Sequence, residues 1–138
     1  MLSLILAATV LTAPAAEAVE KPVVAAYYYK VRWGFQKEFE TLFFANHYPL
    51  LKAQKATGRI KDVEVFKPTY HGDGHADWTF LVVITFSSEA AFRAPGEEQK
   101  LIDKLYPDQE KYKKEEQRRF EILDAHWDVP LDPVSPPQ

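Results

Sequence analysis

Apolar residues recur at every second position in several stretches of the chain, which is the period of a β-strand. The four stretches with this period are residues 23–33, 60–67, 77–86 and 119–127. The first and third are apolar on both alternating faces: in the first, Tyr27 and Tyr29 share one face and Tyr28 lies on the other. The pattern therefore predicts four strands, two of which are covered on both sides.

Between the strands the apolar period lengthens to three or four residues, the spacing of an amphipathic helix. The first helix is expected over residues 35–56. Within it, Pro49 removes a backbone donor, so the helix should kink or restart near Tyr48. A second helix begins after the Ser87-Ser88 pair, and a short, highly charged helix ends near Gln117.

The resulting order of elements is β-α-β-β-α-β, which predicts a ferredoxin-like α+β sandwich whose inner strands are the first and the third. Helices cover only one face of such a sheet. Because the inner strands are apolar on both faces, the other face would expose a larger apolar patch than monomers usually carry. The simplest cover is the same face of a second subunit, so we expect a homodimer.

The N-terminus has the features of an export signal. The first twelve residues are almost wholly apolar, and Ala16-Glu17-Ala18 follows with the small-x-small pattern that signal peptidase recognises. No Lys or Arg precedes the apolar run, which departs from the usual signal, and the run is too short to span a bilayer. We divide the chain into a signal peptide (1–18), a ferredoxin-like domain (19–128) and a Pro-rich tail (129–138), and expect periplasmic or secreted localisation.

Composition narrows the possible partners and chemistry. The chain has 138 residues and no cysteine, which excludes disulfides, thiolate metal sites and a Cys nucleophile. With a net charge of −3 and no basic block, we expect neither nucleic acid nor, after signal cleavage, a membrane as partner. Aromatic residues make up 14% of the chain, which is typical of a dense core or of an apolar ligand pocket.

His47 is the first candidate catalytic residue. It lies at the margin of the apolar stripe of the first helix, and Pro49 frees the backbone carbonyl of Ala45 close by. A neutral imidazole in a semi-apolar pocket can act as a general base or bind a polar ligand group, with Tyr27 or Tyr29 assisting as catalytic phenols. The alternative is a structural His bonded to a neighbouring carbonyl, with both tyrosines in the core.

Other side chains complete the candidate pocket. The expected substrate-binding residues are Phe43, Tyr48, Trp78 and His126. His126 has the alternative of a strand-end His bonded to the backbone. Arg118 and Arg119 can bind a carboxylate ligand, but the glutamates around them predict surface ion pairs of small energetic value instead.

One loop of the chain carries several potential metal ligands. His71, Asp73, His75 and Asp77 alternate there, which is a density of ligands that metal sites show. The same composition is that of an ordinary polar loop, and we favour this interpretation. We therefore expect no metal site, and the sequence leaves any cofactor unknown.

The element order and the segment Phe43-Phe44-Ala45-Asn46-His47-Tyr48-Pro49-Leu50 resemble the dimeric α-β barrel superfamily. Its members include EthD-like proteins, antibiotic-biosynthesis-type monooxygenases, haem-degrading monooxygenases and stress-responsive barrel proteins. The segment is similar to the EthD pattern in which a His stands one residue before Pro-Leu. The resemblance implies a pocket between sheet and helices for small aromatic, polyketide-like or haem-like molecules, with His47 as base or polariser.

Two functions from different classes fit these observations. The first is an exported enzyme of the cofactor-independent monooxygenase or isomerase type, acting on a small apolar or aromatic molecule. The second is a non-catalytic periplasmic protein that binds a small ligand or haem, or responds to stress. Replacement of His47 by Ala separates them, because it should abolish turnover in the first case and only weaken binding in the second.

Overall fold

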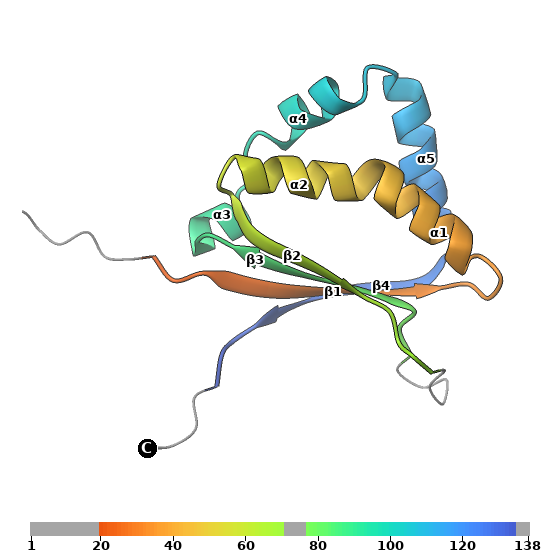
Figure 1. Ribbon diagram of the computed structural model, residues 1–138, viewed down its shortest axis with the longest axis horizontal. Coiled ribbons are helices and arrows are strands. Elements are labelled where there is room, and N and C mark those ends of the chain that lie inside the picture. The colour runs from red at the N-terminus through yellow and green to blue at the C-terminus, as the bar shows by residue number, and fades with distance from the viewer. Residues whose placement is uncertain (1–19, 71–76, 135–138) are drawn as a thin grey trace, which may run out of the picture.

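The computed structural model describes residues 20–70 and 77–134. Within these residues the strands form a four-stranded antiparallel sheet in the order β2-β3-β1-β4, with all the helices on one face (Figure 1). The strands are β1 (Val23–Val31), β2 (Ile60–Phe66), β3 (Phe80–Phe86) and β4 (Leu123–Leu131). This arrangement confirms the ferredoxin-like α+β fold expected from the sequence.

The first helical layer consists of three consecutive pieces. They are α1 (Gln36–Leu42), the π-helical turn η1 (Phe43–His47) and α2 (Tyr48–Ala56). Helix α2 begins at Tyr48 with Pro49 in its first turn, as expected, because proline needs no backbone partner there. Gly58, with a φ of +81°, then turns the chain from α2 into β2.

The second helical layer follows β3 and leads into the last strand. It comprises α3 (Glu89–Arg93), α4 (Glu98–Leu105) and α5 (Gln109–Glu121). The hydroxyl of Ser88 caps α3 by accepting from the Ala91 backbone N–H at 3.1 Å, and the carboxylate of Asp108 caps α5 in the same way. In Figure 1, α4 and α5 arch over α1 and α2, so α5 descends to the sheet beside β4.

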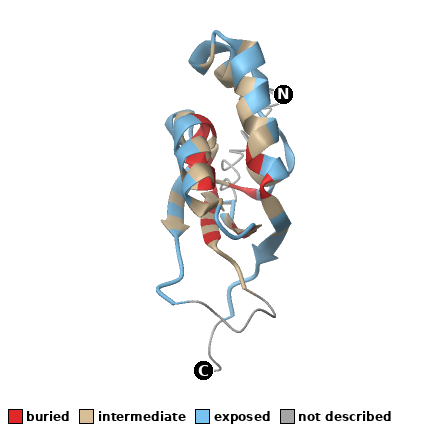
Figure 2. Cartoon of the chain, turned by 90° about the vertical axis from the view of Figure 1, so that its right-hand side faces the viewer, coloured by how far each residue is buried: buried red, intermediate tan, exposed pale blue. Residues whose placement is uncertain are grey.

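The core lies between the sheet and the helices, where the buried residues gather (Figure 2). Its centre is aromatic: the Phe43 ring lies 4.8 Å from the Phe80 ring, and the Phe39 ring lies 5.2 Å from both Phe80 and Tyr29. These rings come from α1, η1, β1 and β3, so they hold the first helical layer on the inner strands.

The C-terminal part differs from the sequence expectation. The charged helix does not end near Gln117, since α5 continues to Glu121 and β4 spans Leu123–Leu131. Glutamate–arginine contacts at helical spacing, including Glu116 with Arg119, favour continuation of the helix. β4 includes residues 129–131, which were assigned to the tail; Pro130 is tolerated because β4 lies at an edge of the sheet.

No described helix covers the second face of the sheet, which we call the open face (Figure 1). Its aromatic centre is Tyr28, whose ring stacks on Trp127 at 5.3 Å and meets the edge of Trp78 at 6.1 Å. The register of the strands places further apolar residues on this face: Val24, Leu81, Val83, Val129 and Leu131. Among the described residues, no helix is long and apolar enough to cross a membrane.

Candidate active site

His47 ends the π-helical turn η1 and lies close enough to Arg119 and His126 for their charges to act on it. Its ring packs 5.5 Å from Phe43, and part of its surface remains accessible. Burial among neighbouring groups, reinforced by the positive charge of Arg119, lowers the pKa of His47 to about 3. The imidazole is therefore neutral at physiological pH, so it can accept a proton at one nitrogen and donate one from the other.

Tyr29 and Tyr27 occupy the helix-covered face of β1. Tyr29 is 3% exposed, and burial raises the pKa of its phenol to about 12, so the hydroxyl remains a hydrogen-bond donor. Burial, and then the charge of Asp128, also raises the pKa of Tyr27. The structure thus brings Tyr29 close to the region of His47, while Tyr27 lies one alternate position farther along the strand.

His126 stands opposite Tyr29 on β4, and the two rings stack at 4.3 Å and 15°. Its Nδ1 lies 2.9 Å from the backbone carbonyl oxygen of Tyr28, and its Nε2 lies 3.1 Å from Oδ1 of Asp128. Both partners are acceptors, so a neutral imidazole donates its single N–H to one of them at a time. The backbone contact anticipated for a strand-end His is present, and this residue is exposed on the edge strand β4 while its ring covers Tyr29.

The expectation that Arg119 forms a surface ion pair is wrong. Arg118 does form such a pair, with both its Nε and Nη2 donating to Glu38. Arg119 is only 1% exposed and donates from Nε and Nη2 to the two carboxylate oxygens of Glu116, at 3.0 and 2.7 Å. Successive residues of a helix point about 100° apart, so one arginine faces water and the other faces the sheet.

We call Tyr29, His47, Glu116, Arg119 and His126 the interior cluster. They come from β1, η1, α5 and β4, and mutual electrostatic effects link His47, Tyr29 and His126 to Arg119 or to one another. The sequence contains a signal that could have identified the part on α5. Tyr112, Glu116 and Arg119 follow helical spacing of four and three residues, which places polar groups on one face once the helix extends past Gln117.

The remaining expected residues divide between the two faces of the sheet. Phe43 is fully buried below the cluster, and Tyr48 packs against Phe43 and Phe44 at 6.3 and 5.4 Å. Trp78 is apart from them, because β3 begins only at Phe80 and the Trp78 ring joins Tyr28 on the open face. The loop with His71 and His75 lies outside the described residues, and the described residues contain no cluster of metal-ligating side chains.

The carbonyl freed by Pro49 has a structural use. The hydroxyl of Tyr106 donates to the Asn46 carbonyl oxygen and lies 3.5 Å from that of Ala45, which ties the end of α4 to η1. Beside this contact is a cavity of about 320 Å³, which Tyr106 and Tyr112 line. Burial, and then the charge of Glu116, raises the pKa of Tyr112 to about 12.

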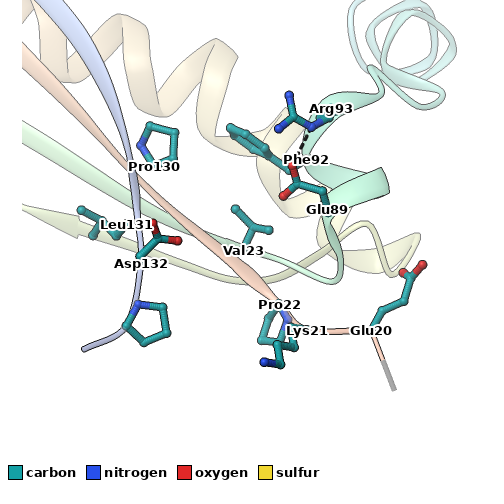
Figure 3. A pocket seen from close by; sticks show the side chains of 11 residues that line it. Glu20, Lys21, Pro22, Val23, Glu89, Phe92, Arg93, Pro130, Leu131 and Asp132 are labelled. Carbon is teal, nitrogen blue, oxygen red and sulfur yellow. Dashed lines mark hydrogen bonds and ion pairs between the residues drawn. The ribbon is translucent and has the colours of Figure 1, made fainter. Parts of the chain in front are cut away.

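A larger groove, of about 690 Å³, lies at the other end of the molecule (Figure 3). Val23, Phe92 and Leu131 form its apolar part, and the ion pair between Arg93 and Glu89 stands at its side. Both partners of this pair are largely exposed to solvent. The groove presents no buried ionisable group, whereas the interior cluster combines burial, charge and a shifted His, which are the marks of a catalytic or binding site.

Comparisons with known proteins identify the fold. No family model and no curated protein sequence matches this chain. Among solved structures, a hypothetical protein of Arabidopsis thaliana is 16% identical, with a TM-score of 0.56 over 89% of this chain and 97% of that one. A dimeric ferredoxin-like protein from an uncultured marine organism is 11% identical, with a TM-score of 0.54 over 85% of this chain and 91% of its own.

A candidate antibiotic biosynthesis monooxygenase of Bacteroides thetaiotaomicron shares the fold as well. It is 8% identical, with a TM-score of 0.52 over 86% of this chain and 95% of that one. These similarities confirm the ferredoxin-like fold expected from the sequence. At such identities the reaction has to be argued from the site itself.

Proposed function

We propose that this chain is a cofactor-independent enzyme that transfers a proton on a small apolar or aromatic molecule held at the interior cluster. The observation that carries the proposal is His47, a neutral imidazole beside the buried cation Arg119 in an otherwise aromatic interior. This combination supplies a proton acceptor and a fixed positive charge that acts on it.

The reaction follows from the charges of these groups. His47 takes a proton from carbon or oxygen of the ligand, and the electron pair left behind moves onto a ligand oxygen near Arg119 and the Tyr29 hydroxyl. The new negative charge offsets the field of Arg119, which is one cause of the lowered pKa of His47. The base therefore becomes stronger as the proton moves, and the same imidazole can return the proton at another atom, which completes an isomerisation.

A specific observation favours the second function, ligand binding without turnover. A pKa of about 3 makes the free imidazole a weak base, and such a group serves a binding site equally well as a neutral hydrogen-bonding partner. In this role His47 orients a ligand between η1 and the sheet, and no bond in the ligand changes.

One experiment separates these functions. The purified protein is incubated in D₂O with 2-indanone, an aromatic ketone with exchangeable α-hydrogens, and exchange is followed by proton NMR. The proposal expects deuterium exchange faster than in buffer alone. His47→Gln should abolish this exchange, whereas Arg118→Gln, a change at a surface residue, should leave it intact. Binding of 2-indanone without exchange supports the second function, and neither binding nor exchange overturns both.

We also propose that the protein works as a homodimer outside the cytoplasm. The apolar open face supports dimerisation, and the structurally similar marine protein is itself described as dimeric. Export rests on the N-terminal pattern of residues 1–18, which lie outside the described residues. N-terminal sequencing of the protein recovered from periplasm or medium should begin at Val19; a start at Met1 would contradict export by cleavage.

A further inference from the structure

Arg119 has hydrogen-bonding capacity that the described residues leave unused. Its Nε and Nη2 are both taken by Glu116, in a two-pronged pair. Its Nη1, which carries two N–H groups, is buried and has no hydrogen-bonding partner among the described residues. The Tyr29 hydroxyl also lies close enough to the guanidinium for hydrogen bonding to contribute to its raised pKa, but Nη1 itself has no partner of hydrogen-bonding geometry among the described residues.

A buried donor without a partner is rare, because desolvation without a hydrogen bond is unfavourable. A group that satisfies Nη1 brings an acceptor oxygen to the guanidinium whose charge also acts on Tyr29 and His47. Part of the wall can move: the half-exposed Phe120 ring lies 4.5 Å from the guanidinium carbon and can rotate away from it. A small ligand can enter beside α5 in this way.

The charge of the acceptor is set by what already surrounds Arg119. Glu116 neutralises the guanidinium, and Asp128 adds a negative charge that acts on Tyr29 from β4. The next cation, Arg59, is tied to Glu98 at 3.9 Å. An anionic ligand would therefore be an excess negative charge in a poorly solvated place, whereas an uncharged oxygen would not.

We infer that Arg119 and Glu116 together form a recognition site for the carbonyl oxygen of an uncharged ligand, and that Glu116 excludes carboxylates from it. Arg119 holds the oxygen through Nη1, and Glu116 orients the guanidinium while cancelling its charge. This inference rests on the interior cluster being the ligand site of the proposed function. It adds the chemical class of the ligand, a small aromatic ketone or related carbonyl compound.

The test compares three probes of one shape by calorimetric titration of the full protein: 2-indanone, indane and indane-2-carboxylate. One hydrogen bond to a charged donor corresponds to about tenfold in affinity, so 2-indanone should bind about tenfold tighter than indane. Indane-2-carboxylate should bind more weakly than 2-indanone. Arg118→Gln, which alters only the exposed neighbour, should leave this order unchanged.

The decisive variant is Glu116→Gln, because it predicts a gain that a folding defect cannot imitate. Without the carboxylate, Arg119 becomes an unbalanced cation, and indane-2-carboxylate should gain at least about tenfold in affinity. The double variant Arg119→Gln with Glu116→Gln removes the pair as a unit and should bind 2-indanone and indane equally.

Several outcomes would overturn the inference. The first is equal binding of 2-indanone and indane by the unaltered protein, which would assign Nη1 to a water molecule. The second is tighter binding of indane-2-carboxylate than of 2-indanone, and the third is an unchanged affinity for indane-2-carboxylate in Glu116→Gln. Because every readout is a binding constant, a protein that shows the expected order but no deuterium exchange upholds the inference while contradicting the enzymatic proposal.

Discussion

At the scale of single residues, the interior cluster depends on two groups held in unfavourable surroundings. His47 is kept neutral and Arg119 is buried with one nitrogen unpartnered. Such groups reduce stability unless something compensates them, and they are concentrated at functional sites for this reason. In this chain the compensation for Arg119 is partial and comes from Glu116 alone among carboxylates within pairing distance in the described residues.

The lowered pKa of His47 predicts how the stability of the fold changes with pH. The unfolded chain takes up a proton near pH 6.5, whereas folded His47 does so only near pH 3, so His47 lowers stability as pH falls through this window. Between pH 7 and pH 5 this contribution amounts to about 2 kcal/mol. Urea unfolding at both pH values should therefore show that the unaltered protein loses free energy of unfolding as the pH falls. The loss in His47→Gln should be smaller by this amount.

The carboxylates titrate alike in the two proteins, so the difference between them reports on His47. Equal losses would show that the imidazole is as well solvated in the folded state as in the unfolded chain. The pH change would then have to be attributed to other groups, and the neutral imidazole of the proposed function would lose its support.

At the scale of elements, the π-helical turn η1 places His47. A π-turn widens the helix locally and commonly occurs at functional sites, because it shifts one side chain out of the regular stripe. Pro49 has no N–H to donate to the Ala45 carbonyl, and the Tyr106 hydroxyl lies near this carbonyl and donates to that of Asn46. The hydroxyl of Tyr106 thus connects the second helical layer to the turn that carries the candidate base.

We expect Tyr106→Phe to reduce the free energy of unfolding by about 1 kcal/mol, the net value of one hydrogen bond. Urea unfolding monitored by circular dichroism measures it, and Tyr70→Phe is the control, since Tyr70 is 85% exposed. The variant should also weaken binding of 2-indanone, because η1 loses a constraint next to His47. Unchanged stability and binding would mean that η1 is held by the core contacts of Phe43 alone.

Much of the element level could be predicted. The strands, the restart of the helix at Tyr48 and the cap before α3 follow from local patterns of apolar residues, proline and serine. The end of α5 could not, because Arg119 to Glu121 suit a helix or a strand and only contacts with Glu116 and the sheet decide between them. The expected exposure of Arg119 depends on this boundary, because the longer helix places its side chain against the sheet, where it is buried.

At the scale of the whole molecule, the sheet has one face for the core and one open face. The open face combines a stacked Tyr28–Trp127 pair with aliphatic residues on either side. Exposed apolar surfaces of this kind mark an interaction site, and the same face of a second copy is the cover that the proposed homodimer supplies.

The dimer proposal predicts that Tyr28→Glu converts the protein to a monomer, because it places a charge at the centre of the paired faces. Sedimentation velocity should show half the mass of the unaltered protein. Leu105→Glu, which places the same charge on an exposed apolar position of α4, should remain dimeric. A monomeric unaltered protein would contradict the proposal, and so would a dimer that tolerates Tyr28→Glu.

The sequence by itself determined the element order, the ferredoxin-like fold and the two-sided apolar inner strands, because these depend on periodicity along the chain. It also selected His47, Tyr29 and His126 as candidates from their chemistry. Only the tertiary structure decided that they meet at Arg119, and that Trp78 lies apart on the open face. The burial of a side chain and the electrostatic field acting on it depend on residues that are far apart in the chain, so local sequence patterns do not reveal them.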